Sequence, residues 1–231
     1  MIQRNRRYIK NEPNKDAHKI YVICEGSETE HNYFTFFKEL SSNLEIIDIP
    51  SKDGQTDPLK LKEWTKNNLL NDSPAYRINY LEGDTVWFVI DTDSWETEGK
   101  ITPLREFCKN LNQTELKKYS ELKPYTAWQV GQSNPCFEIW LYYHFFANAP
   151  NTEEIEKFAN FKEFLSNNIS GGFDNVKDPT RLEVAIANAY ANFRFDENEK
   201  LALYSTELYK LGKEILGFIK KDLDKYRNKL N

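Results

Sequence analysis

The residues best suited to chemistry are two aspartates at the end of an apolar segment. The stretch VWFVIDTD begins at Val86, so Asp91 and Asp93 stand two positions apart after an unbroken apolar run. Such a run is typical of a strand buried on both faces of a parallel sheet, and side chains at i and i+2 of a strand point the same way. The pair predicts a site for Mg²⁺ or Mn²⁺, which prefer oxygen ligands and relieve repulsion between carboxylates. The alternative is a purely structural role, in which both residues open a turn.

A third acid, Glu25, follows a second apolar segment. The residues KIYVIC from Lys19 predict a strand that leads directly into Glu25 and Gly26. Ligands of parallel sheets bind where the strands end at their carboxyl side. If the two strands are neighbours, we therefore expect Glu25 to lie beside Asp91 and Asp93. One Glu and two Asp from separate strand ends would suit metal-assisted phosphoryl transfer.

The acids that follow Gly26 have structural explanations. Ser27 and Glu30 match a capping box, in which the two residues satisfy free amides at the start of a helix. Glu28 falls in the first turn of the same helix, where the helix dipole favours an anion. Structural roles are therefore favoured for Glu28 and Glu30, and Glu28 is kept as an accessory candidate for the acidic site.

A third segment, SNPCFEIWLYYHF from Ser133, holds weaker candidates. Asn134 and Pro135 predict the N-cap and first residue of a helix, so Ser133 and Asn134 are candidates to bind a phosphate at the helix start. Glu138 would lie in the first turn, either as compensation for the helix dipole or as a fourth acidic ligand. His144 ends an apolar stripe. It is a candidate for an acid–base role, although a structural, hydrogen-bonded histidine is favoured.

Three blocks in this order make the chain resemble the RloB-like family, which carries a Toprim-type catalytic domain. The blocks are VICEGSETEHNYF from Val22, VIDTD ending at Asp93, and SNPCFEIWLYYHF, and the third is the most specific. The resemblance implies a Mg²⁺-dependent fold that cleaves nucleic acid. It also implies metal-binding roles for Asp91 and Asp93. For Glu25 it implies the role of a general acid or base that sometimes binds the metal.

The resemblance further implies a role in bacterial anti-phage defence, including abortive infection, together with an ABC-type or AAA-type ATPase. The chain departs from the family pattern at two positions. Ser27 stands where an acidic residue is common, and Thr92 stands where a basic one is common. The second departure leaves less positive charge beside the metal site, which bears on substrate affinity rather than on the chemistry.

The order of apolar segments predicts an α/β fold. Strands and helices alternate and are then followed by helices alone, which indicates a Toprim-like, mostly parallel sheet flanked by helices, with a helical C-terminal cap. The expected strands are 19–24, 44–49, 86–90 and 126–130. The expected helices are 28–40, 58–70, 101–111, 135–146, 153–167, 180–193 and 206–229. The expected parts are a basic N-terminal tail (1–17), the catalytic domain (18–148) and a helical region packed on it (149–231).

Composition narrows the class of protein. A net charge of −5 over 231 residues does not suit a bulk nucleic-acid coat. Three cysteines without metal-like spacing argue against a disulfide framework and fit a reducing cytoplasm. No apolar run approaches the length of a membrane span, and the N-terminus has no apolar signal segment. We therefore expect a cytoplasmic protein without a membrane partner.

The leading interpretation is a Mg²⁺- or Mn²⁺-dependent endonuclease with a nucleic acid as its partner. The alternative is a non-catalytic regulatory or assembly subunit of a partner ATPase complex, since the chain has no P-loop of its own. A third interpretation is a nucleotidyltransferase or phosphotransferase built on the same acids. No aromatic platform or groove-reading motif stands out, so the sequence leaves DNA, tRNA and other RNA open as substrates. It also leaves a homo-oligomer open.

Overall fold

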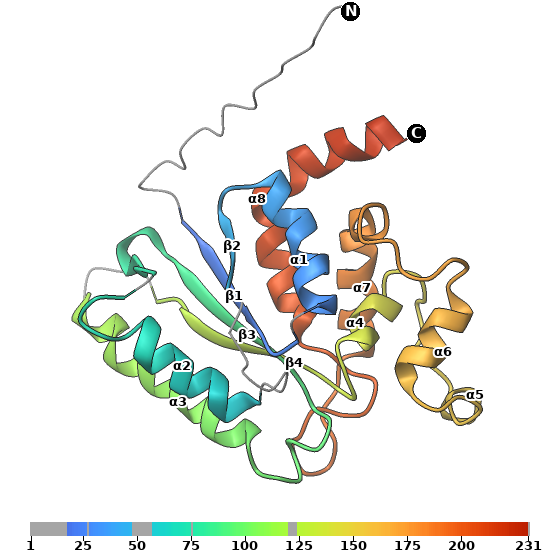
Figure 1. Ribbon diagram of the computed structural model, residues 1–231, viewed down its shortest axis with the longest axis horizontal. Helices are drawn as coiled ribbons and strands as arrows, with labels where there is room; N and C mark the ends of the chain where they lie inside the picture. Colours follow the sequence, from blue (N-terminus) through green and yellow to red (C-terminus); the bar gives the residue numbers. More distant parts are fainter. Residues whose placement is uncertain (1–17, 27, 48–56, 75, 120–123, 231) are drawn as a thin grey trace, which may run out of the picture.

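The computed structural model describes residues 18–26, 28–47, 57–74, 76–119 and 124–230. Within them the chain forms a four-stranded, all-parallel sheet with the order β2-β1-β3-β4 (Figure 1). The strands are β1 (Ile20–Cys24), β2 (Leu44–Ile47), β3 (Thr85–Asp91) and β4 (Trp128–Ser133). The predicted α/β class and parallel sheet are confirmed. The predicted tail 1–17 and the last two residues of the predicted strand 44–49 lie outside the described residues.

Helices cover both faces of this sheet, which explains why its central strands are almost wholly apolar. One face packs against α2 (Pro58–Asn68) and α3 (Ile101–Thr114). The other face packs against α1 (Thr29–Leu40), α4 (Glu138–Tyr142) and helices of the C-terminal region (Figure 1). Short 3₁₀ helices, η1 (Tyr80–Glu82) and η2 (Leu116–Lys118), precede β3 and follow α3. The sheet therefore exposes mainly its edges and strand ends to solvent.

The C-terminal region packs against the sheet rather than standing apart. It consists of α5 (Thr152–Ile155), α6 (Phe161–Asn168), η3 (Asp178–Arg181), α7 (Leu182–Asn192) and α8 (Leu208–Leu230). From α8, the carboxylate of Glu214 accepts a 2.9 Å hydrogen bond from the indole of Trp87 and a second bond from the hydroxyl of Thr85. The predicted single helix 153–167 is wrong. It is interrupted, and Asn160 caps the start of α6 by accepting the amide of Glu163.

The predicted helix 135–146 starts later than the sequence indicates. The helix runs only from Glu138 to Tyr142, so the prediction that Asn134 and Pro135 begin it is wrong. Strand β4 continues through Ser133, and the amide of Asn134 then bonds the carbonyl of Ser205 at 2.9 Å. The Asn134–Pro135 peptide bond is cis, and the Pro135 carbonyl accepts the amides of Thr92 and Asp93. Tertiary pairing therefore takes the place of the predicted helix start.

None of the helices in the described part of the chain combines the length and the apolar character needed to cross a membrane.

Candidate active site

The carboxyl ends of β1 and β3 bring Glu25 and Asp91 together. The two strands are paired in register up to Cys24 and Val89, so the residues that follow leave the sheet side by side. Oε2 of Glu25 accepts a 3.1 Å hydrogen bond from the amide of Asp91. Oε1 of Glu25 accepts a bond from the indole of Trp95. The predicted neighbourhood of these two acids is therefore present.

The two aspartates do not share one strand. Asp91 is the last residue of β3, and its Oδ1 accepts a 2.7 Å hydrogen bond from the amide of Phe137. Asp93 lies beyond the strand with a φ of 32°, in the left-handed region, and is exposed to solvent. The expectation that both project from the strand by i, i+2 alternation is therefore wrong. Their carboxylates still interact, since Asp93 contributes to the raised pKa of Asp91.

Two further carboxylates, Glu30 and Glu138, belong to the same group. Glu30 is only 5% exposed, and its carboxylate accepts the backbone amides of Gly26 and of Glu30 itself. Glu138 is 6% exposed, and its Oε2 is buried with no hydrogen-bond partner among the described residues. Glu30 thus satisfies a free amide in the first turn of α1, in keeping with the structural role predicted for it, and also belongs to the acidic group. Ser27 lies outside the described residues, and Glu28, the N-cap residue of α1, makes no capping bond with its side chain.

Burial and mutual repulsion raise pKa values within this group of acids. Burial raises the pKa of Asp91 well above its usual range, and the carboxylates of Glu30, Glu25, Glu138 and Asp93 raise it further. Burial also raises the pKa of Glu25 to about 8, even though its hydrogen bonds to the Asp91 amide and the Trp95 indole oppose the shift. Burial also raises the pKa of Glu30, whereas that of the more exposed Asp93 is raised by partial desolvation of its carboxyl group and by the charge of Glu138. Five carboxylates thus share one electrostatic neighbourhood, which we call the acidic cluster: Glu25, Glu30, Asp91, Asp93 and Glu138.

The cation of this site comes from the C-terminal region. Nζ of Lys162, in the first turn of α6, lies 3.5 Å from Oε1 of Glu138. Burial alone would lower the pKa of Lys162, but the carboxylates of Glu138 and Asp91 raise it above its usual value. Among the described residues, Lys162 is the single cation within ion-pair distance of the acidic cluster. No sequence pattern indicates this role, because Lys162 lies outside the three motif blocks.

The donor atoms of the acidic cluster suit a hard divalent cation. All are carboxylate oxygens, the ligands that Mg²⁺ and Mn²⁺ favour, and the buried Oε2 of Glu138 is without a partner among the described residues. As the side chains stand, however, no three His, Cys, Asp or Glu residues of the described chain are arranged to hold a metal ion. Glu25 and Asp91 are engaged with Trp95 and with the Phe137 amide. Binding a metal therefore requires these side chains to turn toward it.

Contrary to the prediction from the sequence, Ser133 and Asn134 are not arranged to bind a phosphate at a helix start. Ser133 is fully buried, and its hydroxyl lies 2.8 Å from that of Thr206. The side-chain amide of Asn134 donates a 2.7 Å bond to the carbonyl of Leu201. Neither residue stands at the start of a helix. Glu28, the other accessory candidate from this edge, is exposed to solvent.

His144 has the environment of a structural histidine. It is fully buried, with Nε2 3.1 Å from the hydroxyl of Tyr33 and Nδ1 3.0 Å from the carbonyl of Trp140. Burial lowers its pKa to about 3, so the ring stays neutral at physiological pH. Of the two roles left open by the sequence, the structure favours the hydrogen-bonded one.

Comparison with known proteins assigns the family. A family model described as RloB-like protein matches residues 20–215. That span includes every residue of the acidic cluster and Lys162. A search of curated proteins and a search of solved structures each returned no match. Since the family model covers most of its length, the chain belongs to the RloB-like protein family.

Proposed function

We propose that this protein is a metal-dependent nuclease that hydrolyses phosphodiester bonds in nucleic acid. The supporting observation is the acidic cluster, in which five carboxylates repel one another at the carboxyl edge of a parallel sheet. Like charges held together destabilise a fold, and strongly shifted carboxyl pKa values are typical of functional sites. The carboxyl ends of the strands are also where parallel sheets bind their ligands.

The residues of the cluster suit distinct roles. Asp91 and Asp93 would hold Mg²⁺ or Mn²⁺, and a bound ion would neutralise the scissile phosphate and its leaving oxygen. Glu25, with a pKa of about 8, carries a proton at neutral pH and is suited to transfer it to or from the reacting oxygen. Lys162, which lies beside Glu138, would stabilise negative charge on the phosphoryl group. Glu30 and Glu138 would complete the oxygen donors.

The test is incubation of the purified protein with DNA and total RNA in Mg²⁺, Mn²⁺ or EDTA. We expect cleavage that needs a divalent metal and is lost in Asp91→Asn and in Glu25→Gln, both of which keep the shape of the side chain. Glu39→Gln, an exposed residue near the end of α1, is the matched control and should cleave normally. Metal-dependent cleavage that persists in both cluster variants would overturn the mechanism. Analysis of the product ends distinguishes hydrolysis from nucleotidyl or phosphoryl transfer.

We further propose that the nuclease acts in bacterial anti-phage defence beside an ABC-type or AAA-type ATPase. Membership of the RloB-like family supports this setting. The test is co-expression with an ABC-type or AAA-type ATPase taken from the neighbourhood of the gene. We expect the two proteins to co-purify and phage plaques to be reduced by the wild type but not by Asp91→Asn. Plaque reduction that Asp91→Asn retains would refute a nuclease role in defence.

One observation favours a second candidate, a non-catalytic regulatory or assembly subunit of the ATPase complex. In the described residues, no three ligands stand ready to hold a metal. This alternative predicts that the protein changes the ATPase rate of its partner while the purified pair cleaves no nucleic acid with any divalent metal. Metal-dependent cleavage by the pair, lost in Asp91→Asn, decides against it.

A further inference from the structure

Aromatic rings and lysines gather where the end of α7 meets the start of α8. The ring of Tyr209 lies 5.4 Å from that of Tyr190 and 5.2 Å from that of Phe193. Nζ of Lys213 lies 4.4 Å from the centre of the Tyr190 ring, and Nζ of Lys210 lies 5.3 Å from that of Phe193. Cations are thus held against aromatic faces at the surface of the protein.

Two rings of this group are open to solvent. Tyr190 is 60% exposed, and Phe195, which contacts Phe193 at 5.1 Å between ring centres, is 53% exposed. Exposed aromatic rings beside lysines are the combination that proteins use to stack unpaired bases and to bind the phosphates between them. A core-packing role does not explain rings that remain half exposed.

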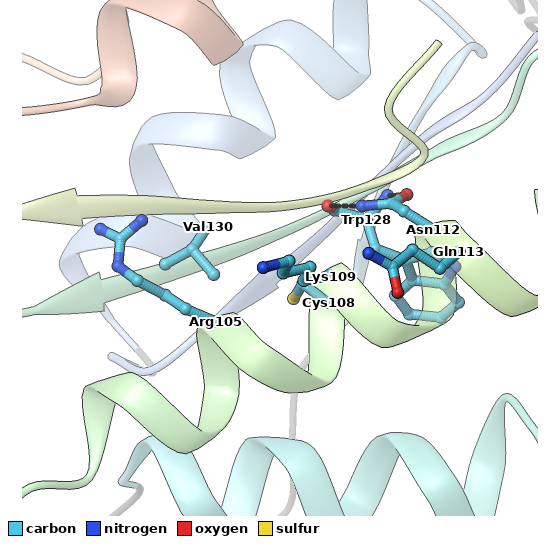
Figure 2. A pocket seen from close by; sticks show the side chains of 7 residues that line it. All are labelled: Arg105, Cys108, Lys109, Asn112, Gln113, Trp128 and Val130. Atoms are coloured by element: carbon cyan, nitrogen blue, oxygen red, sulfur yellow. Dashed lines mark hydrogen bonds between the residues drawn. The ribbon is translucent and has the colours of Figure 1, made fainter. Parts of the chain in front are cut away.

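A basic pocket lies close by, along the outer edge of β4. It has a volume of about 410 Å³ and lies between α3 and the strand (Figure 2). Figure 2 shows Arg105 and Lys109 on α3, beside Val130 and Trp128 of β4. The residues that line the pocket include these two cations and no acid. The pocket therefore favours an anion.

Glu207 connects this pocket to the aromatic group. One of its carboxylate oxygens accepts a hydrogen bond from Arg105, and the other accepts a 3.0 Å bond from Lys210. Arg105 and Lys210 are therefore neighbours across a single buried carboxylate. Lys109 and Lys213 form no ion pair with any other described residue, so their charges are available to a ligand. Pocket and rings form one surface with an excess of positive charge.

The same surface is linked to the acidic cluster by hydrogen bonds. Arg105 donates a 2.7 Å bond to the side-chain oxygen of Gln132, and the side-chain nitrogen of Gln132 donates a 2.8 Å bond to the hydroxyl of Thr92. Thr92 stands between Asp91 and Asp93. A ligand bound at Arg105 is therefore separated from the loop that carries the aspartates by two side chains, those of Gln132 and Thr92.

We propose that this β4-edge surface, made of Arg105, Lys109, Tyr190, Lys210 and Lys213, binds single-stranded nucleic acid and leads it to the acidic cluster. The inference rests on the proposed nuclease function and names its substrate class. The excess of cations selects a polyanion, and the exposed rings select unpaired bases, because paired bases offer no free face for stacking.

Binding can be measured without cleavage by fluorescence anisotropy in EDTA. The probes are labelled single strands of DNA and RNA of about 20 nucleotides, long enough to cover a typical binding site, and duplexes of the same length. We expect the double variant Lys109→Glu and Lys213→Glu to bind single strands at least about 10-fold more weakly, with a shallower dependence on salt. Tyr190→Ala should weaken single-strand binding by about 5-fold or more and duplex binding less.

Lys225→Glu is the matched control. It reverses the charge of an exposed lysine on the same helix, about 18 Å from Lys213 along the helix axis. It should bind like the wild type. The inference would be overturned if the double variant bound single strands as tightly as the wild type, or if the wild type preferred duplexes. It would also be overturned if the double variant lost the binding of a protein partner but not the binding of nucleic acid. If the double variant binds single strands normally and the protein still cleaves nucleic acid, the proposed binding surface is refuted but the nuclease function is not. Strand binding without cleavage in any divalent metal refutes the nuclease and leaves the surface standing.

Discussion

Oε2 of Glu25 accepts the amide hydrogen of Asp91 over 3.1 Å, so a carboxylate of the acidic cluster joins the ends of β1 and β3. The same residue thus has a structural and a proposed chemical task. Truncation to Ala would remove both. Gln removes the charge and keeps one oxygen that can accept the Asp91 amide, although its NH2 group replaces the oxygen that accepts the Trp95 indole. It therefore disturbs the strand ends less than Ala and is the more informative substitution at this position.

Neutralising Asp91 should stabilise the metal-free protein. Asp91→Asn removes the carboxylate that burial and four neighbouring acids disfavour, and the Asn oxygen can still accept the Phe137 amide. We expect a gain on the order of 1 kcal/mol, which raises the melting temperature by roughly 2–4 °C for a chain of this size. Thermal unfolding in EDTA measures it, with Glu39→Gln unchanged. A lower melting temperature for Asp91→Asn would contradict the proposed repulsion.

Gly26→Ala should disable the site at small cost to the fold. A Cβ at residue 26 would overlap the carboxylate of Glu30 and push it out of the cluster. The obstructed group is the end of a flexible side chain, so we expect metal-dependent cleavage to fall by roughly 10²-fold while the melting temperature changes little. Cleavage assays and thermal unfolding of the same preparation test this. Activity equal to the wild type would show that the position of Glu30 is unimportant.

Lys162→Gln should slow cleavage by roughly 10²-fold, the usual effect of removing one group that stabilises transition-state charge. The reason is that Lys162 brings the positive charge nearest to Glu138, Asp91 and Asp93. The comparison is with Lys157→Gln, an exposed lysine that precedes α6. Equal cleavage rates for the two variants would remove Lys162 from the mechanism.

His144 should make the protein sensitive to acid. Burial lowers its pKa to about 3 in the folded state, against 6.5 for an ordinary histidine. Between these values the unfolded chain binds a proton that the folded chain does not. The free energy of unfolding should therefore fall by up to about 1.4 kcal/mol for each pH unit below 6.5 and be independent of this group above it.

His144→Gln isolates this contribution, because Gln cannot titrate but can bond Trp140 and Tyr33. Urea unfolding of both proteins from pH 7.5 to 4.5 gives the comparison. We expect the difference in stability between wild type and variant to shrink as the pH falls. A difference that stays constant with pH would mean that His144 is not held neutral. Titration of the acidic cluster affects both proteins alike and cancels.

The sequence was informative where a feature is local to a strand end. The apolar runs located β1 and β3, and the acids directly after them, Glu25 and Asp91, lie together as the parallel pairing requires. Glu30 was assigned to capping because a local pattern explained it, and nothing local reveals that its charge also raises the pKa of Asp91. Local reasoning therefore succeeds for the strand ends and fails for the helix beside them.

Features set by distant segments were out of reach. Asn134 and Pro135 carry the local signal of a helix start, but pairing with Ser205 and the bond from the Thr92 amide to the Pro135 carbonyl hold them otherwise. Lys162 reaches the cluster from a helix whose own sequence shows only ordinary surface charge. Such contacts follow from the packing of the whole chain.

The outer edge of β4 is closed at two places by the protein itself. The side chain of Asn112 bonds the backbone of Ala127 and Trp128, and the amide of Glu207 bonds the carbonyl of Gln132. An uncovered strand edge invites pairing with another molecule, which leads to fibrils and precipitates. By covering both ends of its last strand, the protein withholds that template from its neighbours, which disfavours aggregation through the edge of β4 at high concentration.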